Sequence, residues 1–406
     1  MSSIRRRCVF YLSGFDPKGA SHYHALYREA SARQAAVSGL SVTVGSRRRT
    51  PEGNAAWSVR SEPDGVDTHY EFLRWDDIVR QHWPKQMWKL WWDVVRTTAF
   101  NVWQGALWRM YLRSWPPALA LFMPFVLVLA QTLGVPLLAL LAAWWLGQAG
   151  SPVGLAGVCG VGVGLSGWAL TRWLEARYAM YWMMRSYAFT RRQALGQVPS
   201  LEQRLDEHAA HLVERWREGG DDELLLVGHS TGAVMAVSVL ARACALEPRL
   251  GRQVAGQGPR VALLTLGQWI PALGLLPQAR AFRAELAALA QWSVDWLDFS
   301  APPDGCCFAL TDPYAACGLV SPRVNFPRLL NPRFAQMFDA ARYQVLKRDK
   351  FLMHFQYLMA SECKTDYDYF AITAGAQSLN NRFADLPCVT DFADLRPFRW
   401  WRGGCF

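Results

Sequence analysis

The residues best suited to chemistry lie in the segment DELLLVGHSTGAVMAVSVLARACAL, at positions 222–246. Residues 224–227 predict a short buried strand, and residues 233–246 predict a helix rich in small side chains. Between them, GHSTG at 228–232 has the G-x-S-x-G pattern of a nucleophile elbow, a sharp strand-to-helix turn that presents a serine. The strand before the motif and the helix after it make this match far more specific than the bare pattern.

Ser230 is therefore the candidate nucleophile, and Gly228 and Gly232 are the elbow glycines, because a Cβ at either position would collide with the backbone. The following helix N-terminus favours developing negative charge. An oxyanion hole needs two backbone N–H donors, one of them from the residue after the nucleophile, which is Thr231. The second is expected from the loop after the first strand, at the Phe15 amide.

A base must activate this serine, and in folds with such an elbow the base follows the nucleophile in the chain. His229 lies inside the elbow and is expected to point away from the serine hydroxyl, so His354 is the candidate base. A buried core histidine is the alternative explanation of His354, which begins an apolar helical run. The histidines are His22, His24, His69, His82, His208, His211, His229 and His354.

The acid is expected between the serine and the histidine, just past a strand, where it can orient the imidazole through its Nδ1 hydrogen. Asp304 follows the β-prone run WSVDWLDFS in the turn SAPPDG and is the preferred candidate. Asp298 and Asp312 are reserves, and a simple Pro-Asp-Gly turn is the alternative explanation of Asp304. The carboxylates in this interval are Glu247, Glu285, Asp295, Asp298, Asp304, Asp312, Asp339 and Asp349.

The strand, the GHSTG turn, the helix, the late aspartate and the later histidine together resemble the α/β-hydrolase superfamily. The resemblance covers about residues 5–50 and 195–375. It implies an α/β fold with a mostly parallel sheet flanked by helices and a triad in the chain order Ser230, Asp304, His354. The sequence indicates no metal or organic cofactor. The chain departs from the pattern through a long insertion before the elbow and through the long interval between the acid and the base.

Composition points toward lipid. The chain is 51% hydrophobic and only 19% charged, and it contains 20 Trp. Its net charge of +10 is compatible with binding to nucleic acid or to an anionic membrane surface. Because the basic residues lie beside Trp-rich segments, we expect the membrane and no nucleic-acid partner. The nine Cys lack metal-site or disulfide spacing, which favours a reducing, cytoplasm-facing location.

Residues 116–171 contain no Asp, Glu, Lys, Arg or His. A bilayer core of about 30 Å is crossed by about 20 helical residues, so two spans are expected, at about 117–146 and 152–171. A buried helical hairpin is the alternative. The prolines at 124 and 136 are expected to kink the first span or to mark a shallower element.

Basic residues flank the pair of spans, with Arg109 and Arg113 before it and Arg172 and Arg177 after it, whereas the connecting turn has none. The positive-inside tendency then places both long polar segments in the cytoplasm. The preceding segment, residues 75–115, is crowded with Trp, Arg and Lys and is expected at the membrane interface, although an ordinary amphipathic helix is the alternative. We expect an integral protein of a bacterial inner membrane with the hydrolase domain facing the cytoplasm.

Three parts follow. Residues 1–75 are expected to form the first part of the hydrolase domain, with a strand at 8–15, a helix at 21–37 and a small β meander. Residues 76–195 would hold the interfacial helices and the transmembrane hairpin. Residues 196–406 would carry the triad.

The expected activity is cleavage of an ester or thioester in a small-molecule acyl substrate. The membrane location suggests that this substrate is a lipid. An acyltransferase with the same triad and a non-catalytic membrane scaffold that kept the fold are the alternatives.

Overall fold

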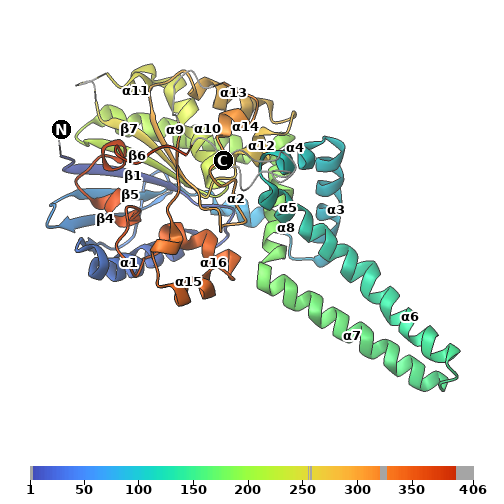
Figure 1. Cartoon of the computed structure of the whole chain (residues 1–406). Coiled ribbons are helices and arrows are strands. Elements are labelled where there is room, and N and C mark those ends of the chain that lie inside the picture. The colour runs from blue at the N-terminus through green and yellow to red at the C-terminus, as the bar shows by residue number, and fades with distance from the viewer. Residues whose placement is uncertain (1–2, 255, 257, 321–326, 390–406) are drawn as a thin grey trace, which may run out of the picture.

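The computed structural model describes residues 3–254, 256, 258–320 and 327–389. Within them, nine strands form one sheet in the order β2-β4-β5-β1-β6-β7-β8-β9, with β3 paired to β4 (Figure 1). The six neighbouring strands from β5 to β9 are parallel, and β2, β3 and β4 add an antiparallel edge. The prediction of an α/β fold with a mostly parallel sheet is confirmed. The strands are β1 (Arg6–Leu12), β2 (Ser41–Val44), β3 (Arg48–Arg49), β4 (Ala55–Glu62), β5 (Asp67–Phe72), β6 (Glu223–His229), β7 (Arg260–Leu266), β8 (Asp295–Phe299) and β9 (Arg328–Leu330).

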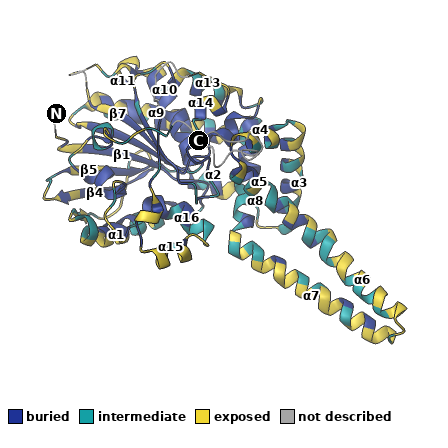
Figure 2. Ribbon diagram, viewed as in Figure 1, coloured by how far each residue is buried: buried dark blue, intermediate teal, exposed yellow. Residues whose placement is uncertain are grey.

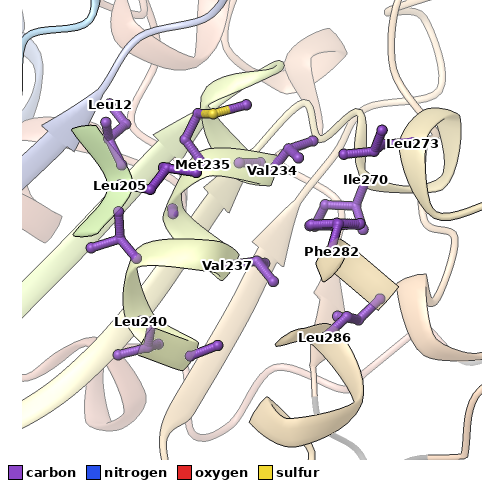
Figure 3. Close-up of a cluster of buried hydrophobic side chains, with 14 of the residues drawn as sticks. Leu12, Leu205, Val234, Met235, Val237, Leu240, Ile270, Leu273, Phe282 and Leu286 are labelled. Carbon is purple, nitrogen blue, oxygen red and sulfur yellow. The ribbon is translucent and has the colours of Figure 1, made fainter. Parts of the chain in front are cut away.

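The central strands are covered on both faces, which explains their continuous apolar runs. Every residue of β6 is buried, and the side chains of β1 alternate between two separate cores. Helices α9, α10 and α13 cover one face, where apolar side chains of α10 pack among those of β1, α9, α12 and α13 (Figure 3). Helices α1, α16 and α17 lie on the other face. The helices of this part are α1 (Gly19–Ser38), α9 (Pro199–Glu218), α10 (Gly232–Leu246), α11 (Pro248–Arg252), α12 (Ile270–Gly274), α13 (Arg280–Leu289), α14 (Pro313–Ala316), α15 (Ala340–Leu346), α16 (Lys350–Phe355), α17 (Tyr369–Ala374) and α18 (Leu379–Arg382).

The β meander predicted in the first part belongs to the main sheet. Strands β4 and β5 form an antiparallel pair, and β5 continues the sheet by pairing in parallel with β1. The chain leaves β5 at its carboxyl end and returns only at α9, so a long helical insertion separates β5 from β6. The insertion contains α2 (Asp76–Gln81), α3 (Met87–Trp103), α4 (Ala106–Arg113), α5 (Trp115–Leu129), a π-helical segment (Ala130–Gly134), α6 (Val135–Gln148), α7 (Val153–Tyr178) and α8 (Met180–Ala194).

Helices α6 and α7 form a hairpin that projects from the body of the protein (Figure 1). Together with α5 they supply two helical stretches that are long and apolar enough to cross a membrane, Trp115–Gln148 and Val153–Tyr178. Figure 2 shows most of the hairpin exposed, and only 17% and 11% of the most apolar windows of the two stretches are buried. A buried core hairpin, the alternative explanation of these sequences, is therefore excluded.

The first stretch is not one regular helix, and its two halves have different surroundings. Pro136 has no N–H and its ring crowds the carbonyl one turn earlier, and the π-helical segment lies directly before it. Helix α5 packs on α3, α4 and α8, whereas α6 contacts chiefly α7. The expected span at about 117–146 therefore divides into α5, which joins the body, and α6, which projects.

The two hairpin helices approach closely at glycines. A Cβ on Gly160 would lie 2.9 Å from Ala139 O and from Ala143 Cβ, and a Cβ on Gly167 would lie 3.0 Å from Val135 Cγ2. Small residues at such spacing let helix backbones approach in lipid, where dispersion contacts replace the hydrophobic effect.

Candidate active site

The GHSTG turn has the backbone geometry of a nucleophile elbow. Ser230 has φ 59°, in the left-handed region that a residue other than glycine seldom adopts. A Cβ on Gly228 would lie 2.6 Å from Gly232 O, and a Cβ on Gly232 would lie 2.6 Å from Ser13 O, so neither position accepts a side chain without a shift of the backbone. The Ser230 amide donates to Leu266 O on β7 at 2.9 Å, which ties the strained turn to the sheet.

His354 and Asp304 are in direct contact. His354 Nδ1 lies 2.8 Å from Asp304 Oδ2, although 50 residues separate them. The Tyr357 hydroxyl donates to the same oxygen at 3.1 Å, and the Cys306 amide donates to Oδ1 at 3.0 Å. Burial alone would raise the pKa of Asp304, but the charge and hydrogen bond of His354 and the other donors hold it below its ordinary value. The carboxylate is thus ionised and accepts the hydrogen on Nδ1 of His354. Nε2 then carries no hydrogen and is free to act as a base.

The two reserve acids have other roles. Asp298 lies inside β8, where its carboxyl accepts hydrogen bonds from the Thr265 and Ser300 hydroxyls, each at 2.7 Å. Burial raises the pKa of Asp298 to about 7. Asp312 caps the N-terminus of α14 by accepting from the Tyr314 amide at 2.8 Å. Among the candidate carboxylates that the structure describes, only Asp304 bonds to His354.

Ser230 and His354 line one pocket, together with both predicted oxyanion residues, Phe15 and Thr231. Neither the Phe15 amide nor the Thr231 amide has a hydrogen-bond acceptor among the described residues. Likewise, no hydrogen bond between the Ser230 hydroxyl and His354 occurs in the described part of the chain, a contact that often tightens only when substrate binds. The pocket therefore contains a strained serine, a histidine with one free nitrogen and two unused N–H donors.

The loop that carries Phe15 is held by a buried carboxylate that we did not predict from the sequence. Asp16 accepts from the Lys18 amide at 2.9 Å and from the Tyr23 hydroxyl at 3.0 Å. The loop approaches the elbow so closely that a Cβ on Gly14 would lie 3.0 Å from Ser230 Cβ. These contacts hold the loop that carries Phe15 beside Ser230.

The pocket wall is aromatic, and much of it comes from the insertion. Tyr178, Trp182 and Tyr187 of the insertion line the pocket together with Phe351 and Phe355 of α16. The rings of Trp182 and Phe351 are in contact, with centroids 5.0 Å apart. No local pattern in the sequence indicates these side chains, because helices distant in the chain bring them together.

His229 has a positioning role that its place in the elbow did not reveal. Its Nε2 lies 2.8 Å from the backbone carbonyl of His354. Burial and the nearby His354 lower the pKa of His229 to about 3, so the ring is neutral and Nε2 carries the proton that it donates. The elbow thus holds the backbone of the candidate base.

Replacing His229 with phenylalanine keeps a ring but leaves the buried His354 carbonyl without a donor. We expect the free energy of unfolding to fall by about 1–3 kcal/mol, the cost of a buried unsatisfied polar group. We also expect the rate of Ser230 modification by a fluorophosphonate to fall about tenfold, as for a small displacement of a catalytic group. His229→Gln, which retains an N–H donor, should recover most of the rate; equal rates for the two variants would refute the positioning role.

One group of side chains in the described residues could hold a metal ion, and it lies apart from Ser230. Glu52, Glu71 and His211 place ligand atoms within 4.8 Å of one another. Glu71 already accepts from His211 at 3.0 Å and from Asn54 at 2.8 Å, and although burial opposes it, these bonds and His69 lower the pKa of Glu71 to about 2. Glu71 and His211 form an ion pair between β5 and α9, and none of the three residues lines the pocket.

No family model matches this chain, and no curated protein or solved structure matches it either. The likeness to α/β-hydrolases therefore remains a resemblance, and the assignment of function depends on the geometry of the pocket.

Proposed function

We propose that this protein is a serine hydrolase that cleaves an ester or thioester at the surface of a membrane in which its hairpin is embedded. One observation carries the proposal. The His354–Asp304 pair, with its 2.8 Å hydrogen bond, lines the same pocket as a serine in the left-handed conformation and two amides without acceptors. An acyl-transfer site needs these parts together.

The topology supports the same roles. Ser230 follows β6 and Asp304 follows β8, so both lie at the carboxyl edge of the parallel strands, and α16, which comes after β9 in the chain, brings His354 into the same pocket. Ligands of open α/β sheets bind at this edge. The chain order of nucleophile, acid and base also agrees with the order in α/β-hydrolases.

In the proposed reaction, Ser230 Oγ attacks the acyl carbonyl carbon while His354 Nε2 takes the hydroxyl proton. The carbonyl oxygen becomes an oxyanion, which the Phe15 and Thr231 amides stabilise. Asp304 stabilises the imidazolium through Nδ1. His354 then gives its proton to the departing alkoxide or thiolate, and the acyl group remains on Ser230.

Water opens the acyl-enzyme by the reverse sequence. His354 removes a proton from water, the hydroxide attacks the acyl carbon, and Ser230 Oγ recovers the proton as the carboxylic acid leaves. An alcohol or amine acceptor in place of water would make the same site an acyltransferase. Nothing in the pocket favours that alternative over hydrolysis.

The membrane location is supported by the exposed apolar surface of the hairpin and by its length. About 20 helical residues cross the bilayer core. Counted from the turn of the hairpin, this length reaches back to about Leu129 in one helix and forward to about Arg172 in the other. Arg172 is the first charged residue after the turn. Exposed tryptophans cluster on α3 and α4, as at an interface: Trp88, Trp92, Trp103 and Trp108.

We infer the orientation from a contact at the base of the hairpin. Arg177 donates to the carbonyl of Arg348, directly before α16, so the basic end of α7 lies on the catalytic part of the chain. Together with the positive-inside tendency, this contact supports a catalytic part that faces the cytoplasm.

The test is labelling of the detergent-solubilised protein with a fluorophosphonate, which reacts with activated serines. We expect the wild type to be labelled and Ser230→Ala to lose all labelling. We expect His354→Ala to react at least about 10³-fold more slowly, because the nucleophile loses its base. A folded wild-type protein that is not labelled would favour a non-catalytic scaffold with this fold.

A further inference from the structure

A second hollow adjoins the catalytic pocket. It is a groove of about 600 Å³ between α5, the end of α7, the start of α8 and the loop 302–306 that carries Asp304. Its volume falls in the range of about 300–1,000 Å³ that is usual for ligand pockets. Of the described side chains that line it, Lys350 is the only charged one.

The groove and the catalytic pocket meet at shared side chains. Tyr178, Met183 and Cys306 line both. Cys306 Sγ lies 4.0 Å from Met183 Sδ, and the Cys306 amide binds the catalytic acid candidate, so this junction adjoins the triad. The pocket around Ser230 is narrow, about 70 Å³, and has room for a reacting group but not for a long chain. A long substituent must therefore extend beyond this pocket, and the groove lies directly beside it.

At its other end the groove reaches the predicted lipid boundary. Ala130 and Thr171 line it there, next to Leu129 and Arg172, the limits that about 20 helical residues set for each span. Trp115, Leu119 and Val126 line the groove and remain exposed, by 40%, 44% and 39%. Apolar surface of this kind is stable against a lipid chain and costly in water.

We propose that this groove binds the long acyl chain of a bilayer lipid, which enters from the side between α5 and α7 while its ester or thioester carbonyl lies at Ser230. The inference rests on the proposed function and adds to it the substrate class, a long-chain membrane lipid, and the route of entry. Lipid is the occupant because the groove is apolar, ends at the bilayer boundary and joins the catalytic pocket.

The experiment compares two fluorophosphonates, one with an ethyl and one with a dodecyl chain, and measures the ratio of their labelling rates in detergent. Ala120 and Ala130 line the groove on the α5 side, away from the triad. We expect Ala120→Trp to lower the dodecyl-to-ethyl ratio about tenfold, because a single methylene that no longer fits an apolar pocket changes discrimination by about this factor or more. Ala130→Trp should lower the ratio similarly. Leu129→Trp, beside Ala130 but exposed and outside the groove, should keep the wild-type ratio.

The ratio separates the two proposals. A wild-type ratio in both alanine variants, with labelling that depends on Ser230, overturns the acyl groove and leaves the hydrolase standing. Labelling that is absent, or that survives Ser230→Ala, overturns the proposed function itself. Both labelling rates are measured on the same variant, so a general loss of reactivity in Ala120→Trp lowers both rates and leaves their ratio unchanged. Ala130→Trp gives a second, independent measurement of the ratio.

Discussion

Replacing Asp304 with asparagine should lower kcat for a short-chain ester by about 10⁴-fold while the protein stays folded. The carboxylate accepts the Nδ1 hydrogen of His354 at 2.8 Å, which leaves Nε2 as the base. An asparagine amide can turn its N–H toward Nδ1, which favours the tautomer with the proton on Nε2 and removes the stabilisation of the imidazolium. Steady-state hydrolysis of a p-nitrophenyl ester measures the effect.

Asp312→Asn is the matched control. Asp312 was one of the two reserve acids, but it caps α14, and asparagine is an equally good N-cap. We expect its activity to equal that of the wild type. A loss of less than tenfold in Asp304→Asn, or equal losses in both variants, would contradict the assignment of Asp304 as the catalytic acid.

Placing arginine at the centres of the two predicted spans should prevent stable membrane insertion. Leu138 and Val161 lie near the midpoints of the 20-residue spans counted from the turn, and both are exposed, by 58% and 63%. In water an arginine at either position would be harmless. At the centre of a bilayer each costs about 2.5–3.5 kcal/mol, or about 5–7 kcal/mol for Leu138→Arg with Val161→Arg. We expect the double variant to be extracted from membranes by alkaline carbonate, whereas the wild type stays in the pellet.

Leu246→Arg is the control for added charge. Leu246 is exposed by 57% at the end of α10, in the catalytic part of the chain that we place in water. It should remain in the membrane pellet with the wild type. If the double arginine variant also stays there, the hairpin does not span the bilayer.

Features that depend on neighbours in the chain were predictable. The strand β6, the turn at 228–232 and helix α10 follow from one local pattern of apolar residues and glycines, and the left-handed Ser230 agrees with it. The hairpin followed from the absence of charge between 116 and 171. The order of the strands in the sheet could not be predicted from the sequence, because it depends on which strands pair after the long insertion. For example, β5 lies beside β1 and not beside β6.

The assembly of the site required the tertiary structure. Eight carboxylates were possible acids by position, and folding brought one of them, Asp304, to His354. It also gave His229 and Asp16 their positioning roles, since their partners are a carbonyl 125 residues away and a tyrosine on the following helix.

The sequence by itself determined the candidate nucleophile, its glycines and the apolar hairpin, because each is encoded by residues within one or two elements. Only the tertiary structure decided the identity of the acid bonded to the histidine, the division of the first apolar stretch into α5 and α6, and the groove that joins the hairpin to the pocket. These depend on contacts between segments distant in the chain, whose energies arise from packing and burial that no local pattern records.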